Sequence, residues 1–279
     1  ARQIVFAHAA LTIPGEGLLH AERAARANLG ARFASHDLDV GIGAWRMFRQ
    51  EIGGRESLQL RMQGPQFSWE LSLNPSQPLL LQGDAGHSRK GHTPDLASHY
   101  VSWPQLRVAG TLLRQGRRHA VDGRAWFDHE WSTTLLGGGA VGWDWLGINL
   151  GDGGALMAFR MRDAAGSTLY AHAAWRDADG RLQQFASEQV HFTPLRHWQS
   201  PRNGARYPVE IEVRFGEHSI RTRPVVDDQE LSTTLPTPVS YWEGLVRVEG
   251  SLSGRGYLEM TGYAGRLRVG GAAGHRLPA

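Results

Sequence analysis

The chain has 279 residues, of which 41% are hydrophobic and 35 are glycine, and its formal net charge is +3. This length suits one large β domain or two modest ones, and the absence of cysteine excludes disulfides, thiol nucleophiles and thiolate metal sites. The basic residues are mainly arginines scattered along the chain, which argues against nucleic-acid binding, and no run approaches the roughly 20 apolar residues of a membrane helix.

The first hundred residues combine strand-like runs with two candidate helices. The start, from Ala1 to Phe6, has the pattern of a strand, and no signal segment is visible there. Residues 21–29 are predicted to form a helix that Gly30 closes, and a second, shorter helix is expected near 94–99. Residues 67–73 instead alternate apolar and polar side chains, which is the strand signature.

A polar break at 114–118 separates two strand-like runs. We place a domain boundary there, with an N-terminal domain of residues 1–115 and a C-terminal domain of residues 116–279. Alternation recurs beyond the break, and glycine-rich turns separate the runs. The alternating runs lie at 155–161, 209–215, 245–252 and 257–263. Short strands at this spacing indicate antiparallel barrels or sandwiches, so the predicted fold class is all-β.

Tryptophans and acids are concentrated between residues 126 and 145. If the segment 126–131 is extended, Trp126, Asp128 and Glu130 share one face, whereas His129 and Trp131 lie on the other. These residue types together are those expected of a pocket in which a carboxyl group acts beside aromatic rings.

The next strand-like run, 142–150, carries an acid on an apolar face. Asp144 shares that face with three aliphatic side chains, and Trp143 and Trp145 lie opposite. Burial without a cationic partner raises the pKa of a carboxyl group, which suits a general acid at neutral pH, and indole faces could stabilise a cation. A tryptophan that closes a barrel end, tied down by acids and arginines, would give the same pattern, and spacing alone favours this structural interpretation.

Two further positions are weaker candidates. Tyr241 and Glu243 share one strand face, and Trp242 takes the other, so this segment is either a second pocket wall or, as we favour, an ordinary aromatic sheet position. His8 lies among small apolar residues, where a histidine is more often a satisfied core residue than a ligand. No histidine pair lies at ligand spacing beside a carboxylate, so no metal site is expected.

Several of these segments together resemble the AttH-like and carotenoid 1,2-hydratase (hydroxyneurosporene synthase) family of lipocalin-like proteins. The resemblance covers nearly the whole chain, and its most specific part is the pair Asp-His-Glu-Trp and Gly-Trp-Asp-Trp in this order. It is carried by residues 6–10, 83–84 with 90–91, 123–131, 142–145, 198–201 with 207–208, 241–244, and 256–259 with 261–263.

The resemblance implies two calycin-type antiparallel β-barrel or sandwich domains, with ligands in a barrel or between the domains. Members of the family usually begin with an upstream segment rich in Glu-Trp-Trp-Tyr, and this chain starts after that point. The first domain is therefore expected to lack its initial strands or to close differently.

The first functional hypothesis that the resemblance implies is a hydratase-type lyase acting on a prenyl, polyene or carotenoid-like chain. A carboxylic acid, Asp144 or Asp128, would protonate a terminal alkene, and Glu130 or His129 would orient water. No metal or organic cofactor is needed. The remaining candidates would line the ligand site: Trp126, Trp131, Trp143, Trp145, Tyr241, Trp242, Glu243 and His8.

Two alternatives remain open. The second hypothesis is a binding module that holds a lipid or another hydrophobic molecule in the cell envelope of a bacterium, in the periplasm or peripheral to a membrane, in association with an ABC transporter. The third is a template that shapes a polyene for a pericyclic reaction. Acids that point into a roomy apolar cavity without an arginine partner would favour the enzyme, and acids that are salt-bridged in a packed core would count against it.

Overall fold

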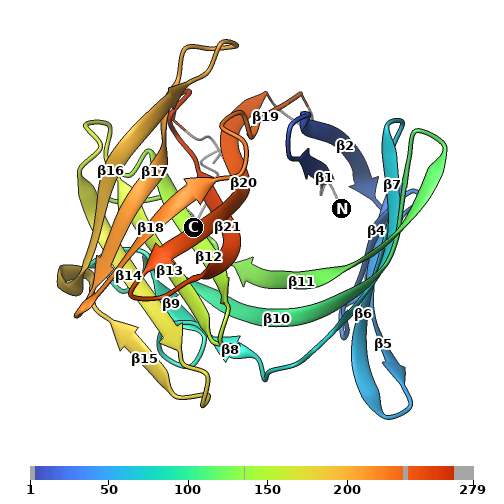
Figure 1. Cartoon of the computed structure of the whole chain (residues 1–279), viewed down its shortest axis with the longest axis horizontal. Helices are drawn as coiled ribbons and strands as arrows, with labels where there is room; N and C mark the ends of the chain where they lie inside the picture. The colour runs from blue at the N-terminus through green and yellow to red at the C-terminus, as the bar shows by residue number, and fades with distance from the viewer. Residues whose placement is uncertain (1–3, 135, 235–237, 267–279) are drawn as a thin grey trace, which may run out of the picture.

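The computed structural model describes residues 4–134, 136–234 and 238–266 (Figure 1). Within these ranges nearly every element is a strand, and the single helical segment is a short 3-10 turn, η1 (Ser187–Gln189). No helix in the described ranges is long and apolar enough to span a membrane. The predicted all-β fold class is confirmed.

The first sheet is an open, curled half-barrel of eleven strands. Its order is β1-β2-β3-β4-β5-β6-β7-β10-β11, with β8 and β9 also paired to β10, and all pairings are antiparallel except a short parallel contact of β2 with β3. The strands are β1 (Ile4–Ile13), β2 (Gly17–Ala27), β3 (Gly30–Phe33), β4 (Asp39–Ile42), β5 (Trp45–Ile52), β6 (Arg55–Gln63), β7 (Phe67–Asn74), β8 (Leu80–Leu81), β9 (His87–Arg89), β10 (Ala97–Arg114) and β11 (Arg117–Trp131).

The second sheet has ten strands in the order β15-β14-β13-β12-β21-β20-β18-β17-β16, with β19 paired to β20. Its strands are β12 (Gly142–Leu150), β13 (Ala155–Arg162), β14 (Thr168–Arg176), β15 (Leu182–Phe185), β16 (Val190–Gln199), β17 (Arg206–Phe215), β18 (His218–Pro224), β19 (Glu230–Thr233), β20 (Val239–Gly250) and β21 (Gly254–Met260). Alternate side chains from most of these strands fill the inside of the curl, among them the fully buried Leu146, Ile148 and Val246. The inside of the curl is therefore the packed core of the second sheet.

The expected helix at 21–29 is wrong, because most of this segment belongs to β2. Ala21 lies opposite Ala9 in the pairing with β1, and it packs against a buried cluster of the first sheet. Alanine's helix propensity is a fraction of a kcal/mol per residue and is easily overridden by such packing. Gly30 has a positive φ, as the residue that closes a helix often does, but here it follows the turn at the end of a strand, which is closed by a hydrogen bond from Leu29 N to Arg26 O.

The expected helix near 94–99 is also wrong. The chain makes a turn that is closed by hydrogen bonds from Leu96 N to Thr93 O and from Lys90 N to Leu96 O. β10 then begins at Ala97. Pro94 fixes its own φ but does not require a helix, and it lies in the turn that leads into β10.

The polar break at 114–118 is the tight turn between β10 and β11. These two strands pair along most of their length in the same sheet. The chain passes from the first sheet to the second only between Trp131 and Gly142, later than the domain boundary that the sequence suggests.

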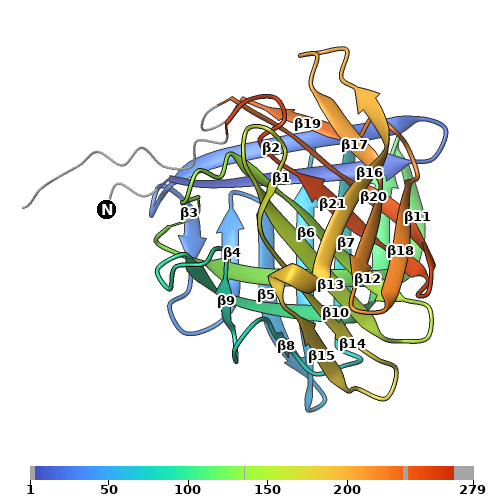
Figure 2. The ribbon, with the colours of Figure 1, turned by 90° about the vertical axis from the view of Figure 1, so that its left-hand side faces the viewer.

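The two sheets are joined at both ends of the space between them. The long strands β10 and β11 run from the first sheet to the second along the lower part of Figure 1, where Gln105 N donates to Asn149 Oδ1 at 2.7 Å. At the other end β1 and β2 pass beside β19 and β20 (Figure 2), and Thr12 Oγ1 donates to Gln229 Oε1 at 2.9 Å. The half-barrel therefore closes over the outer face of the second sheet.

Candidate functional site

A cavity of about 1430 Å³ lies between the two sheets. One wall comes mainly from β10 and β11 of the first sheet, and the other from β12, β13, β20 and β21 of the second. The second wall is the outer face described above, so its side chains alternate with those of the packed core.

Strand register arranges that wall in rows. Glu243 lies directly opposite Glu259, and Glu259 lies opposite Trp145 on the next strand. Two residues further along the strands, Leu245 lies opposite Tyr257. One end of the wall thus carries two carboxyl groups and a tryptophan, and the next row along the strands is apolar. We call the first the carboxyl end and the second the apolar row.

Asp128 projects from β11 into the carboxyl end of the cavity and is fixed there by hydrogen bonds. Trp126 Nε1 donates to its Oδ1 at 2.7 Å, and Tyr100 OH donates to its Oδ2 at 2.8 Å. The tyrosine oxygen in turn accepts from Trp145 Nε1 at 2.9 Å, which leaves its single proton for Asp128. Ser102, which lies opposite Asp128 in β10, is a further partner. These donors orient the carboxylate and favour its ionised form.

The surroundings of Asp128 also oppose its ionisation. Burial raises its pKa to about 6, against hydrogen bonds from Ser102, Tyr100 and Trp126 that lower it. The side chain is nevertheless open to the cavity, so water reaches it while the cavity is empty. An apolar ligand that displaced this water would raise the pKa of Asp128 further. A pKa near 6 already allows the carboxyl group to accept or release a proton close to neutral pH.

Lys90 neutralises a second carboxylate at this end. Its Nζ lies 2.6 Å from Glu130 Oε1 and 4.3 Å from the centroid of the Phe159 ring. Burial lowers the pKa of Lys90, and the negative charges of Glu130 and Asp128 oppose this. Glu130 also accepts a hydrogen bond from Ser98. Glu130 is therefore occupied by two partners.

Glu243 and Glu259 form the most unusual pair in the cavity. Burial raises the pKa of Glu243 to about 7 and that of Glu259 to about 8. The negative charge of Asp128 adds to the rise for Glu243, and that of Glu243 adds to the rise for Glu259, because nearby like charges disfavour double ionisation. Trp143 donates a hydrogen bond to Glu259, which opposes the rise only in part. Within the described residues neither carboxyl group forms an ion pair, so at neutral pH the pair holds a proton that it can donate.

Asp144 is not part of the cavity, which corrects its assignment as an acid. Its carboxylate is buried in the second sheet, with Arg160 Nε at 2.7 Å and Arg162 Nε at 3.0 Å, and it accepts from Tyr263 OH at 3.0 Å. The apolar face that the sequence predicts is real, but it faces a packed core. Its partners enclose the carboxylate in that core, and it does not line the cavity, so Asp144 is withdrawn as the general acid.

Three other predicted residues also lie away from the cavity. His129 and Trp131 occupy the opposite face of β11, as the alternation predicts, and Trp131 stacks on His99 with ring centroids 5.2 Å apart. Trp242 is fully buried in the core of the second sheet, where Nε1 donates to Asp227 O at 2.8 Å. Their roles in orienting water or lining the ligand site are therefore withdrawn.

His8 and Tyr241 join the sheets to each other. His8 Nδ1 and Tyr241 OH are 2.9 Å apart, across the contact of β1 with β20. Tyr241 shares a strand face with Glu243, as predicted, and the nearby negative charges of Glu243 and Glu259 add to burial in raising the pKa of the tyrosine. These two residues lie beside the cavity rather than in its lining.

The structure thus brings together Trp126, Asp128, Glu130, Trp143, Trp145 and Glu243 of the predicted residues. The assignments missed Glu259, Lys90 and Tyr100. Lys90 and Glu259 lie within the segments that carry the family resemblance, which is the only feature of the sequence that points to them. The pairing of Glu259 with Glu243 depends on strand register, which the sequence does not show. Within the described residues no three histidine, aspartate or glutamate side chains are placed to hold a metal ion.

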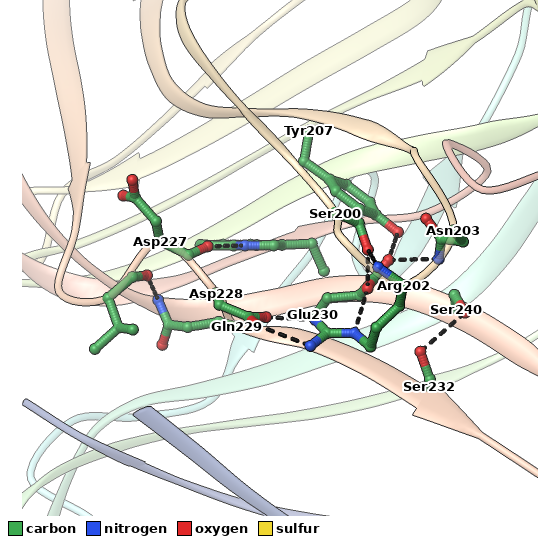
Figure 3. Close-up of polar contacts among 12 residues, drawn as sticks. Ser200, Arg202, Asn203, Tyr207, Asp227, Asp228, Gln229, Glu230, Ser232 and Ser240 are labelled. Atoms are coloured by element: carbon green, nitrogen blue, oxygen red, sulfur yellow. Dashed lines mark hydrogen bonds and ion pairs between the residues drawn. The ribbon is translucent and has the colours of Figure 1, made fainter. Parts of the chain in front are cut away.

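A second polar cluster, around Glu230, lies outside the cavity (Figure 3). The buried carboxylate accepts from Ser200 Oγ at 2.6 Å and from Tyr207 OH, Asn203 Nδ2 and Arg202 Nε, each at 2.8 Å. Burial alone would raise the pKa of Glu230, but the four hydrogen bonds outweigh it and hold the pKa low. The cluster anchors β19 to the turn before β17, and it includes Ser200 and Tyr207 of the segments 198–201 and 207–208 that carry the resemblance.

Comparison with known proteins gives one family and two informative structures. The AttH-like family model matches residues 1–263. The structure of a protein described as AttH (NE1406) from Nitrosomonas europaea is 42% identical, with a TM-score of 0.88 over 93% of this chain and 82% of that one. Kievitone hydratase from Nectria haematococca is 16% identical, with a TM-score of 0.73 over 94% and 85% of the two chains, which shows a shared fold. Comparison with curated proteins gave no match.

Proposed function

The chain belongs to the AttH-like family, and from that premise we propose that the cavity between the sheets binds an apolar chain and adds water to a carbon–carbon double bond in it. The observation that supports the proposal is the carboxyl pair Glu243–Glu259, which keeps a proton at neutral pH beside aromatic side chains. The likeness to a hydratase is of the fold alone, so the carboxyl pair is the chemical support for the proposal.

In the proposed reaction the protonated member of the pair is the general acid. Its O–H bond breaks as the proton joins one alkene carbon, and the π electrons form the new C–H bond. The other carbon becomes a tertiary cation, which the face of Trp145 can stabilise. Asp128, whose pKa of about 6 leaves it ionised at neutral pH and whose donors orient it, positions a water and takes its proton as the C–O bond forms. The carboxyl groups then exchange protons with solvent to restore the starting state.

This assignment changes the roles that the sequence suggests. Asp128 remains a site residue but becomes the base, because its hydrogen-bond partners favour the anion. Glu130 is held by Lys90, and the acid is the pair on β20 and β21. A carotenoid-like or prenyl substrate fits the apolar row of Leu245 and Tyr257, and we propose the trisubstituted alkene of a prenyl chain as the reacting group.

A non-catalytic binding protein is the second candidate, and the size of the cavity supports it. It needs the apolar and aromatic walls but no proton donor. A template for a pericyclic reaction would likewise need the walls and the oriented hydrogen bonds only. The dependence of turnover on the carboxyl pair separates these functions from a hydratase.

The direct test is incubation with an acyclic carotenoid and with farnesol in water enriched in ¹⁸O, followed by mass spectrometry. A tertiary alcohol that carries the label is the expected product. Glu259→Gln and Asp128→Asn should each lower the rate by at least about 100-fold, the scale of general acid–base catalysis. The exposed Glu217→Gln, outside the cavity, should not. Wild-type protein that binds both compounds without forming the alcohol would favour the binding function, and an active Glu259→Gln variant would remove the pair from the mechanism.

The pH dependence of the reaction follows from the same groups. Activity should rise as Asp128 ionises, with its pKa at about 6, and should fall at higher pH as the glutamate pair loses its shared proton. The expected profile of kcat/KM is therefore a bell, and the Asp128→Asn variant should lack the acid limb in its residual activity. A profile that keeps rising above neutral pH would contradict the assignment of a protonated carboxyl group as the acid.

A further inference from the structure

The end of the cavity opposite the carboxyl pair contains a row of arginines. Arg223 lies directly opposite Arg247 in β20, and Arg247 lies directly opposite Arg255 in β21. All three line the cavity, and Arg124 of β11 lines it from the first sheet. We call these four residues the arginine row.

Such a row is unfavourable by itself. Directly opposite positions on antiparallel strands place their Cβ atoms about 5 Å apart, and like charges there destabilise the sheet. Arg223 is compensated by Glu249, whose Oε1 lies 2.7 Å from Arg223 Nε. In the part of the chain that the structure describes, Arg124, Arg247 and Arg255 form no ion pair with protein. With Asp122 and Glu249 as the two acids that also line this end, four positive and two negative charges leave a net charge of +2.

The cavity is therefore polarised along the strands. Arg247 follows Glu243 by four residues in β20, and Arg255 precedes Glu259 by four residues in β21, so about 13 Å separate the two rows at roughly 3.3 Å per residue. The apolar row of Leu245 and Tyr257 lies between them. A negative group is repelled from the carboxyl end and attracted to the arginine end.

We propose that the arginine row binds the anionic head group of an amphiphilic ligand, so that the natural ligand is a prenyl-like chain ending in a phosphate or carboxylate. Guanidinium groups suit either anion because they donate two parallel hydrogen bonds. With its head at the row, the chain extends past Leu245 and Tyr257, and its distal alkene reaches Glu243 and Glu259. The inference deepens the proposed function and rests on it for the placement of the ligand in this cavity.

The test is equilibrium binding, followed by the fluorescence of the tryptophans that line the cavity. Farnesyl monophosphate, farnesoic acid and farnesol are titrated into the wild-type protein below the concentrations at which they aggregate. Farnesyl monophosphate should bind about tenfold more tightly than farnesol, the lower end of what a hydrogen bond to a charged group provides. A matching gain for farnesoic acid would identify a carboxylate as sufficient, and a gain for the phosphate only would identify a phosphate site.

The double variant Arg247→Gln, Arg255→Gln should lose this preference and keep the wild-type affinity for farnesol. Removing a repulsive pair should not impair folding, and urea denaturation checks this. The double variant Arg214→Gln, Arg221→Gln is the matched control, because it removes two exposed charges outside the cavity. Equal affinities for the alcohol and the anions in the wild type, or a preference that survives in the Arg247 and Arg255 variant, would overturn the inference.

The outcomes distinguish this inference from the proposed reaction. Binding needs no turnover. Arginine-dependent binding of farnesyl monophosphate without hydration would therefore contradict the proposed hydration and support a head-group site at the arginine row. Hydration of farnesol without any preference for an anionic head group would support the proposed hydration and contradict a head-group site at the arginine row.

Discussion

At the scale of single residues, two aspartates of the same tryptophan-rich stretch have opposite environments. Asp144 is buried between Arg160 and Arg162, whereas Asp128 faces the cavity and accepts hydrogen bonds from Trp126 and Tyr100. The alternation in the sequence predicts the face of each residue correctly. It does not predict what lies across that face, because Arg160 meets Asp144 only through the register of β12 and β13.

Substitution of Asp144 by asparagine should therefore destabilise the fold without removing the chemistry. Breaking a buried ion pair by removing one partner costs about 3 kcal/mol or more, and Asp144→Asn leaves two guanidinium groups without their carboxylate. Urea denaturation measures the loss, and the exposed Asp179→Asn serves as the control. A variant of unchanged stability that fails to hydrate an alkene would restore Asp144 as a catalytic candidate.

At the scale of elements, strand register creates the site. Glu243 and Glu259 are ordinary outward-facing acids when each strand is considered alone, and only the pairing of β20 with β21 makes them neighbours. For this reason Glu243 can be proposed as a site residue from the sequence of its own strand, whereas Glu259 cannot. The same limit explains β2, whose alanine-rich sequence suggests a helix until its pairing with β1 is known. Hydrophobic alternation predicted the all-β fold well because each strand carries it locally.

The glutamate pair should also appear in the pH dependence of stability. The folded state binds a proton more tightly than the unfolded chain, so this contribution is fully present below a pH of about 4.5 and is lost as the pH rises through the raised folded-state pKa. The free energy of unfolding should fall between about pH 5 and about pH 8, and the Glu243→Gln, Glu259→Gln double variant should reduce that fall. The exposed Glu217→Gln should keep the wild-type slope, and an unchanged slope in the double variant would contradict a proton shared by the pair.

At the scale of the whole molecule, the cavity exists because two sheets of different kinds meet. The second sheet curls around its own packed core, and the first is an open half-barrel that covers the outer face of the second. The sequence resemblance allows a ligand in a barrel or between domains, and the structure places the cavity between the sheets. The sequence does not determine this placement, because the residues that join the sheets, such as Gln105, carry no motif.

Gln105 should contribute to holding the sheets in place. Its side chain donates to Leu150 O at 2.9 Å and Gly154 O at 2.6 Å, across the boundary between the sheets, and it is 4% exposed. Gln105→Ala should lower the free energy of unfolding by about 1–3 kcal/mol through lost buried hydrogen bonds, and should weaken farnesol binding as the walls move apart. The exposed Gln183→Ala is the comparison, and equal effects of the two substitutions would show that the contact is dispensable.

The central claim is that an apolar chain binds between the sheets, and a crystal structure of the protein with farnesyl monophosphate tests it most directly. The account predicts electron density for the ligand between β11 and the outer face of β12, β20 and β21. The distal alkene should lie against Trp145 beside Glu243 and Glu259, and the phosphate at Arg247 and Arg255. Density inside the core of the second sheet, or a chain bound outside the cavity, would contradict the account.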